Sequence, residues 1–331
     1  MSLTVYSNVD LTRRNTMGLN SRARYAATCL TPRDLNSLFE IAQRDQLKVF
    51  PLGSGSNLLL HDWIDGIVLT SIDRSVEIEG VRVTAGAGLS WDELVQITLA
   101  NNLFGLENLS GIPGTVGAAP MQNIGAYGVE LSEMIIGVEV FDLFKNETRY
   151  FDREACQFGY RTSHFKVYQA GQYFITKVIL ELKRHFQPVL VYSDIARLPK
   201  TKTASGQSLR SAVLAIRAGK LPDYNNTPNA GSFFKNPFVT HKMSQDLSSQ
   251  GLRTYSFDGR FKVSAAALIQ AAGLVGIRSG GVRVSPKHAL VFENVGEATL
   301  ADIQDVAGRV REARHTQFGV QLEMEPQAYA V

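Results

Sequence analysis

The sequence predicts an α+β protein made of two or three domains or subdomains. Its 331 residues are too many for one small hydrophobic core. Segments that alternate apolar and polar residues, as strands do, occur between capped apolar stripes of helical period. With 44% hydrophobic and 20% charged residues, the composition is that of an ordinary soluble globular protein.

The first predicted helix begins at Thr31. This residue suits the N-cap, Pro32 suits the first helical position, and Asp34 suits the positive end of the helix dipole. An apolar stripe of helical spacing follows at Leu35, Leu38, Phe39 and Ala42. The stripe is expected to face the core, and a short strand is predicted over residues 47–52.

The middle of the chain predicts a hairpin, a second helix and three further strands. Residues 76–84 alternate around Gly80 as a hairpin does. Ser90 and Glu93 have the spacing of a capping box that opens a helix. Alternation predicts the strands over residues 136–143, 147–152 and 174–183.

The last third of the chain predicts α/β structure after a domain boundary near residue 219. A buried helix is expected over residues 265–272 and a strand over residues 289–293. Thr299 is expected to cap a helix that Gly319 ends.

A final strand is predicted after Gly319. Apolar residues at 320, 322 and 324 alternate there with Gln321, Glu323 and Glu325. A strand with its apolar residues inward would aim both glutamates the other way. The alternative for each glutamate is an ordinary solvated face.

Two glycine-rich tracts are candidate ligand-binding backbones. Residues 53–57 (Gly-Ser-Gly-Ser-Asn) follow a strand and can form a phosphate nest, although they match neither a Rossmann fingerprint nor a Walker A loop. A simple turn between strands is the alternative. Residues 105–128 are the densest glycine tract, and their backbone suits a flat ring and a diphosphate. Their Asn, Gln, Tyr and Met residues argue against a flexible linker.

The loop around Ser232 is the leading candidate for chemistry. Gly231 allows close approach of a ligand, Phe233 and Phe234 can exclude water, and donors follow at residues 235 and 236. The alternative is a polar loop with a buried Phe pair. Arg161 lies in a second aromatic-flanked loop, where a surface or salt-bridge role is the alternative.

Several classes of protein are excluded. The net charge of +3 includes no basic block, so no nucleic-acid partner is expected. Two cysteines are too few for a disulfide framework, and the six histidines lack metal-ligand spacing, so no metal is expected. The most apolar helix-length run, residues 265–277, is too short to span a membrane, and no signal peptide is recognisable. We therefore expect a cytoplasmic protein.

Taken in order, these segments resemble the UDP-N-acetylenolpyruvoylglucosamine reductase (MurB) family of peptidoglycan synthesis, in its longer subclass. The matching segments span nearly the whole chain: residues 15–16, 51–58, 105–108, 112–114, 122–128, 160–161, 219–220, 230–237 and 322–325. The sequence departs from the family's Lys-x-Ser-Ala-Gly-Trp at Ala266 and Ala267, away from the motifs expected to do the chemistry.

The resemblance implies an FAD-binding fold of the vanillyl-alcohol-oxidase (PCMH) type with a C-terminal α/β substrate-binding domain. Residues 1–70 would form one FAD-binding subdomain, with residues 320–331 folding back onto it. Residues 71–218 would form the second, and residues 219–319 would bind the substrate. A monomer with non-covalent FAD is expected.

The resemblance also implies the chemistry. NADPH would reduce FAD, and the reduced flavin would pass a hydride to the enolpyruvyl group of the sugar nucleotide. Arg161 would offset the charge that develops on the substrate carboxylate, and Ser232 would donate a proton to carbon. Glu325 can assist only if it carries a proton, which burial near that carboxylate would favour.

The remaining candidates are binding residues. Those expected to hold the sugar nucleotide are Tyr192, Lys220, Lys235, Asn236, Tyr255 and Lys262. Those expected to hold FAD are Gly53, Ser54, Gly55, Ser56, Asn57, Ile112, Pro113, Gly114, Thr115, Gly117, Gln122, Asn123, Gly125, Ala126 and Tyr127. Two alternatives stay open: another FAD-dependent oxidoreductase of the same fold, and a non-catalytic nucleotide-binding protein.

Overall fold

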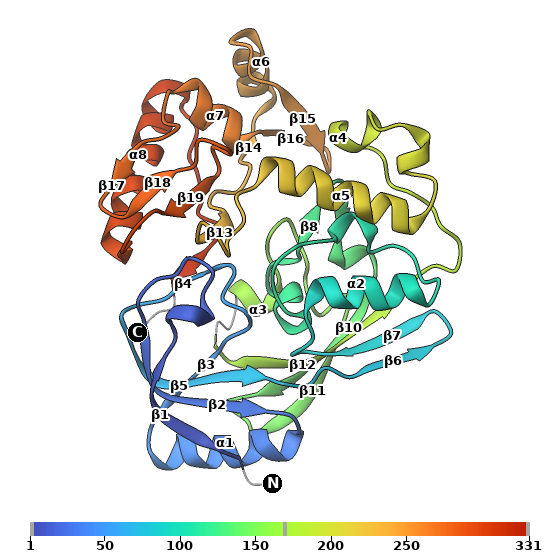
Figure 1. The fold of residues 1–331 in the computed structure, drawn as a ribbon, viewed down its shortest axis with the longest axis vertical. Helices are drawn as coiled ribbons and strands as arrows, with labels where there is room; N and C mark the ends of the chain where they lie inside the picture. Colours follow the sequence, from blue (N-terminus) through green and yellow to red (C-terminus); the bar gives the residue numbers. More distant parts are fainter. Residues whose placement is uncertain (1–2, 168–170, 329–331) are drawn as a thin grey trace. The chain divides into compact units, whose positions relative to one another are not determined.

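The computed structural model describes residues 3–167 and 171–328, which form two compact units. The first unit contains the described residues up to Val9 together with Ala23–Ser54 and Ile64–Gly219. The second contains Asp10–Arg22, Gly55–Trp63 and the described residues from Lys220 onward. Figure 1 shows the elements of both units.

The first unit contains a four-stranded sheet covered by one helix (Figure 1). Its strands, in spatial order, are β1 (Val5–Asp10), β2 (Arg22–Cys29), β5 (Trp63–Ser71) and β3 (Lys48–Pro51). The short strand predicted before the first glycine tract is therefore confirmed as β3, which pairs in parallel with β5.

Helix α1 (Pro32–Arg44) forms as the sequence predicts. The Thr31 hydroxyl accepts from the Asp34 N–H and the Asp34 carboxylate accepts from the Thr31 N–H, which completes a capping box. Leu35 and Leu38 are buried against residues of the sheet. The helix is therefore positioned by its apolar stripe.

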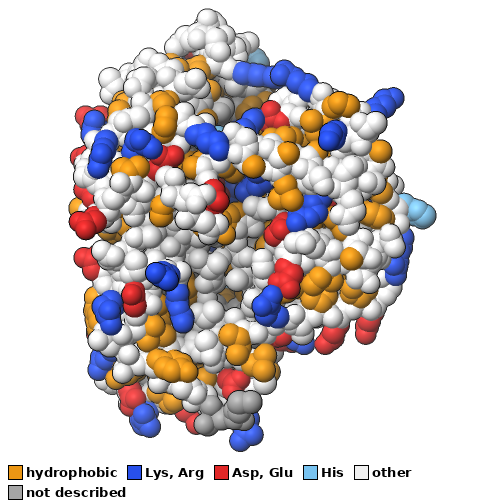
Figure 2. All heavy atoms as spheres, viewed as in Figure 1, with side chains coloured by type: hydrophobic (Ala, Val, Ile, Leu, Met, Phe, Trp, Pro, Cys, Tyr) orange, Lys and Arg blue, Asp and Glu red, His pale blue; other side chains and the backbone are white. Residues whose placement is uncertain are grey.

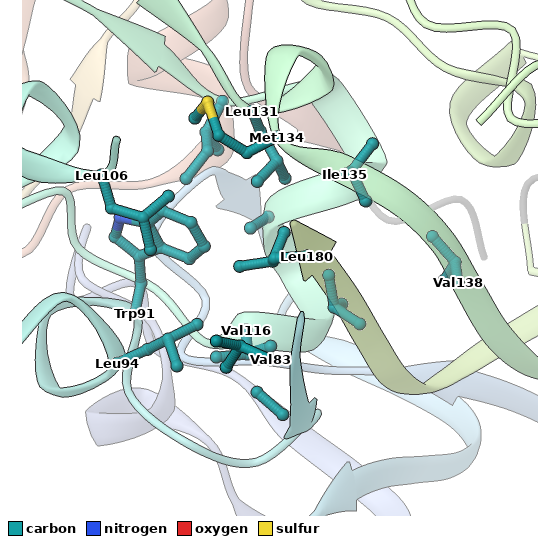
Figure 3. Packing of buried hydrophobic residues seen from close by; sticks show 14 of the residues in the cluster. Val83, Trp91, Leu94, Leu106, Val116, Leu131, Met134, Ile135, Val138 and Leu180 are labelled. Carbon is teal, nitrogen blue, oxygen red and sulfur yellow. The ribbon is translucent and has the colours of Figure 1, made fainter. Parts of the chain in front are cut away.

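A five-stranded antiparallel sheet forms the larger part of the first unit. In spatial order its strands are β11 (Glu147–Asp152), β10 (Ile135–Asp142), β12 (Tyr173–Glu181), β7 (Arg82–Gly86) and β6 (Val76–Glu79). The hairpin and the three further strands are thus confirmed. Figure 3 shows Val83, Val138 and Leu180 of this sheet pointing into a core shared with Trp91.

Helix α2 (Trp91–Ala100) is confirmed, but its predicted capping box is wrong. The Ser90 side chain makes no capping bond, because the Ser90 backbone forms a bridge with Thr115. Asp92 instead accepts from the Gly111 N–H at 2.7 Å and from Arg210 at 2.6 and 2.7 Å. Burial alone would raise the pKa of Asp92, but these donors hold it below the usual value.

The rest of the first unit consists of short elements and one long helix. The short elements are η2 (Glu107–Leu109), η3 (Val116–Gln122), β8 (Gly125–Ala126), β9 (Val129–Glu130), η4 (Leu131–Glu133), α3 (His164–Val167), α4 (Ser193–Ala196) and η5 (Lys200–Lys202). The long helix is α5 (Gly206–Lys220).

The second unit contains three small sheets and three helices (Figure 1). The first sheet has the strand order β13 (Asn229–Ser232), β19 (Val291–Asn294), β18 (Val282–Val284) and β17 (Arg278–Ser279). The second has the order β14 (Phe238–Val239), β16 (Arg260–Val263) and β15 (Thr254–Phe257). The third pairs β20 (Gln327–Ala328) with β4 (Leu58–Leu59). The helices are α6 (His241–Ser249), α7 (Ala265–Ala271) and α8 (Leu300–Phe318), and η1 (Thr12–Arg14) also belongs here.

The predicted helix signals of this unit are confirmed. Thr299 and Asp302 form a capping box at the start of α8, and Gly319 ends it with φ of 63°. Helix α7 forms although Ala266 and Ala267 replace the family's Gly-Trp. Its N-cap is Ser264, and both alanines pack against the core.

The strand predicted after Gly319 is only partly correct. Val320 and Leu322 are buried while Gln321 and Glu323 are exposed, as alternation requires. The segment makes only an isolated bridge, between Met324 and Phe234, and Glu325 is buried at 9% exposure. The alternation fails at Glu325 because the chain bends there, and residues 327 and 328 then pair in parallel with β4.

The surface is mixed in character. On the face that Figure 2 shows, cationic and anionic side chains are interspersed, in keeping with a net charge of +3. Among the described residues, no helix is long and apolar enough to cross a membrane. No cluster of three or more potential metal ligands occurs in this part of the chain.

Candidate active site

The second glycine tract turns its larger apolar residues toward the core of the first unit. Val116, Ala119 and Ile124 are buried, while the small residues between them stay partly accessible. Gly117 donates its N–H to the Ala87 carbonyl at 3.0 Å, and a Cβ there would lie 2.6 Å from the Ala87 Cβ. The accessible side of the tract is therefore backbone and small side chains, which suits a flat ring.

Gly53 brings the first glycine tract against the second. A Cβ at Gly53 would lie 2.9 Å from the Thr115 Oγ1 and 3.2 Å from the Ala118 Cβ. Within the first unit, the end of strand β3 and the start of η3 thus share one small-residue surface. These residues fit the isoalloxazine and diphosphate of a flavin, because glycine permits close approach of the backbone.

Arg161 is at the corner of a tight turn that begins at Gly159. The turn is closed by reciprocal backbone hydrogen bonds between Gly159 and Thr162, at 3.1 and 3.2 Å. Arg161 has φ of 57°, a left-handed conformation that is unusual for a side chain of its size. Its Nη2 donates to the Gly125 carbonyl at 2.6 Å. The predicted catalytic cation is therefore held on the predicted flavin tract.

One residue of this region carried no sequence signal. Arg217 of α5 interacts electrostatically with Tyr127, and burial lowers the pKa of Arg217. The Tyr192 ring packs edge-on against Tyr127, with ring centroids 5.4 Å apart. An arginine on an amphipathic helix resembles a solvated residue in the sequence, so only the fold identifies Arg217.

In the second unit, Ser232 and Glu325 lie on adjacent backbone segments. Phe234 bridges to Met324, and the Glu325 N–H donates to the Phe233 carbonyl at 2.9 Å. The Asn57 Nδ2 donates to the Glu325 carbonyl at 3.3 Å. Three predicted site residues that are distant in sequence thus come together within this unit.

The surroundings of Ser232 combine a rigid aromatic base with open space. Phe233 stacks on Phe292 with ring centroids 4.0 Å apart, and both rings are buried. Gly231 has φ of 70°, and no atom lies within 4 Å of where its Cβ would be. A ligand can therefore approach the backbone beside Ser232, as the sequence predicts.

The predicted substrate-binding residues of this unit have varied environments. Lys235 forms an ion pair with Glu323, and the Asn236 Oδ1 accepts from the Ala265 N–H at 2.9 Å. Lys262 is buried, and its Nζ lies 3.2 Å from the centre of the Phe257 ring. Tyr255 is opposite Lys262 in the β15–β16 pair.

Two further residues flank this region. Lys220 is exposed at the end of α5. The His288 Nδ1 accepts from the Leu290 N–H at 3.3 Å, which fits a structural role in the turn before β19.

The first unit belongs to a defined class of protein. Residues 23–145 match the FAD binding domain family, so the α+β fold is that of an FAD-dependent oxidoreductase. Residues 222–329 match the family described as UDP-N-acetylenolpyruvoylglucosamine reductase, C-terminal domain.

Complete relatives and a solved structure agree with these matches. The chain is 43% identical over 329 residues to the UDP-N-acetylenolpyruvoylglucosamine reductase of Cupriavidus pinatubonensis, with 96% of each covered. It is 40% identical to that of Bdellovibrio bacteriovorus, over 97% of this chain and 98% of the relative. The crystal structure of the MurB enzyme of Thermus caldophilus superposes with a TM-score of 0.72 at 26% identity, covering 99% of this chain and 100% of that one. The chain belongs to the UDP-N-acetylenolpyruvoylglucosamine reductase family, and the predicted fold class is confirmed.

Proposed function

We propose that this chain uses FAD and NADPH to reduce UDP-N-acetylenolpyruvoylglucosamine to UDP-N-acetylmuramate in peptidoglycan synthesis. Family membership supports the activity. The structural observation that supports it most directly is the hydrogen bond between the Glu325 N–H and the Phe233 carbonyl, at 2.9 Å. It keeps a carboxyl-bearing residue beside the segment that carries Ser232, as the roles proposed below for Glu325 and Ser232 require.

FAD supplies the hydride chemistry when it is bound. The residues that would hold it are the small-residue surface of the first unit around Gly53, Thr115 and Gly125, together with residues 55–57. The protein's own contribution is position, charge and a proton.

Arg161 acts on charge. Addition of a hydride to the vinyl carbon pushes electrons onto the substrate carboxylate, which gains nearly a second negative charge. A guanidinium is always cationic and can donate to both carboxylate oxygens, so it stabilises this charge as it develops. Its anchorage at the Gly125 carbonyl leaves the side chain little freedom to reorient before reaction.

Ser232 supplies the proton. Its hydroxyl would transfer a proton to the carbon that bears the ether oxygen, and the resulting alkoxide would regain a proton from solvent. The substrate gains one hydride and one proton, so the carbon–carbon double bond becomes single. Glu325, in its protonated form, would donate a hydrogen bond to the developing enolate.

The substrate's diphosphate and sugar would be bound by the donors that the sequence predicts, Tyr192 among them. The others are Lys220, Lys235, Asn236, Tyr255 and Lys262. We propose that the first unit comprises the two FAD-binding subdomains, and that the enzyme acts in the cytoplasm as a monomer.

The decisive experiment separates the two half-reactions. Purified protein is bleached anaerobically with NADPH, and the enolpyruvyl sugar nucleotide is then added. Recovery of the yellow oxidised flavin is the expected result. Recovery with oxygen but not with the sugar nucleotide would indicate a different flavin oxidoreductase. Protein that is already colourless when purified would indicate a non-catalytic nucleotide-binding function.

A further inference from the structure

The turn that carries Arg161 is attached to the glycine tract at three alternate residues. The Ser163 Oγ donates to the Met121 carbonyl at 2.6 Å. The Asn123 Nδ2 donates to the Gly159 carbonyl at 3.1 Å, and the Arg161 Nη2 donates to the Gly125 carbonyl at 2.6 Å. Residues 121, 123 and 125 therefore each form one attachment, and Asn123 forms the middle one.

The Asn123 side chain makes its hydrogen bonds within the protein. It is fully buried, and its Oδ1 accepts from the Ser132 N–H at 2.9 Å. Its Nδ2 donates to the Glu130 Oε2 at 2.9 Å as well as to Gly159. With both amide hydrogens and the oxygen occupied, this side chain has no donor left for a cofactor.

The geometry also shows why the attachment matters. Asn123 contacts the first residue of the turn, and the guanidinium of the third residue returns to the carbonyl two positions after Asn123. Arg161 has a left-handed backbone, which is unfavourable for a residue with a Cβ and persists only where the surroundings enforce it. Fixing the Gly159 carbonyl is one way to enforce it.

We propose that Asn123 is a positioning residue for Arg161. Its amide holds the turn at Gly159 so that the guanidinium keeps a single orientation on the glycine tract. This inference rests on the proposed function of Arg161. It assigns the Asn123 side chain to the support of the cation, whereas the sequence predicted only that the backbone here holds the flavin.

The test is Asn123→Asp, which keeps the acceptor for Ser132 and the tolerance of a left-handed backbone but loses both amide donors. We expect reoxidation of the reduced flavin by the sugar nucleotide to slow by about tenfold or more, as removal of a group that orients a catalytic residue does. Flavin content and reduction by NADPH should stay close to the unaltered enzyme, because Arg161 acts only after the sugar nucleotide has bound.

A pH profile distinguishes positioning from a merely structural role. The new carboxyl group would be buried beside Glu130 and the Gly159 carbonyl, an environment that favours its protonated form. Once protonated, its O–H can donate to Gly159 again. Reoxidation by the Asn123→Asp variant should therefore recover relative to the unaltered enzyme as the pH falls.

Asn146→Asp is the matched control. Asn146 is also left-handed, with φ of 55°, but it lies exposed in the β10–β11 turn. This variant should leave both half-reactions and their pH profiles unchanged.

Three outcomes would overturn the proposal: equal loss in both half-reactions, no recovery at low pH, or failure of both Asn123→Asp and Asn123→Gly to fold. If instead the unaltered enzyme is not reoxidised by the sugar nucleotide, the proposed function itself is wrong.

Discussion

Arg161 in the first unit and Glu325 in the second are held by very different parts of the chain. Arg161 bonds the Gly125 carbonyl, 36 residues away. The carbonyl of Glu325 accepts from Asn57, which is 268 residues away. The first arrangement is complete once neighbouring segments fold, whereas the second needs a very long loop to close first, which costs entropy.

The two regions also differ in what the candidate residues contact. In the first unit a glycine-rich backbone forms the candidate ligand-binding surface. Close approaches such as that of Gly117 to Ala87 leave no room for larger residues there. In the second unit side chains sit on irregular strands over a stacked phenylalanine base. The first unit thus offers a backbone surface to a ligand, whereas the second presents side chains from a packed aromatic base.

The largest effect should come from removing Ser232, the proposed proton donor of the second unit. Ser232→Ala should slow reoxidation of the reduced flavin by the sugar nucleotide by about 10²- to 10⁴-fold, the usual contribution of a general acid. Reduction by NADPH should be nearly unchanged. Anaerobic stopped-flow absorbance of the flavin measures both steps. If both steps slow together, Ser232 is not the proton donor.

The next largest effect is expected from filling the close approach between Gly117 and Ala87 in the first unit. Gly117→Ala places a Cβ 2.6 Å from that of Ala87, and overpacking of this kind costs about 1–3 kcal/mol. We expect a lower unfolding free energy and weaker flavin retention, measured by urea denaturation and by flavin absorbance.

Gly308→Ala is the matched control in the second unit. Gly308 lies in α8 with no atom within 4 Å of its Cβ position, so alanine should stabilise by about 0.5–1 kcal/mol through helix propensity. Equal effects of the two substitutions would contradict the packing role of Gly117.

Backbone strain at Arg161 allows a sharper comparison. Arg161→Gly and Arg161→Ala should both impair reoxidation by the sugar nucleotide. The glycine variant should nevertheless be more stable than the alanine variant by about 1 kcal/mol, because glycine adopts a φ of 57° without a steric penalty. Thermal unfolding of the two variants checks this, and the reverse order would show that the turn is not strained.

The smallest effect concerns pH. Burial, assisted by the nearby Lys220, lowers the pKa of His288 below its ordinary value of 6.5. The unfolded chain therefore binds a proton at this histidine more readily than the folded chain does. The unfolding free energy should be greatest above about pH 6.5 and should fall as the pH decreases through the lowered pKa. His288→Asn keeps an acceptor for Leu290 and should flatten this dependence in urea titrations between pH 5 and 8.

Sequence reasoning succeeded where the cause of a structure is local. The Thr31 cap, the Gly80 hairpin and the Gly319 helix end depend on residues a few positions apart, and all are present. It failed at Ser90, where a strand-like bridge from Thr115 replaced the side-chain cap. A contact 25 positions along the chain cannot be seen in a local pattern.

The site shows the same division. The exposed face expected for Glu325 as an alternative was wrong, because the chain bends at this residue and Glu325 is buried. The support of Arg161 by Asn123 and the contact of Arg217 with Tyr127 were equally hidden. The motif resemblance predicted the residues of the site, but their partners depend on tertiary contacts.

The pairing of the segment around Glu325 with residues 57 and 233 also has a consequence for synthesis on the ribosome. The glycine tracts of the first unit and the turn that bears Arg161 have all been translated by the time residue 219 is added. Ser232 gains its carboxyl neighbour only after residue 325 has left the exit tunnel. A nascent chain can thus place Arg161 on the glycine tract well before Ser232 acquires its carboxyl neighbour.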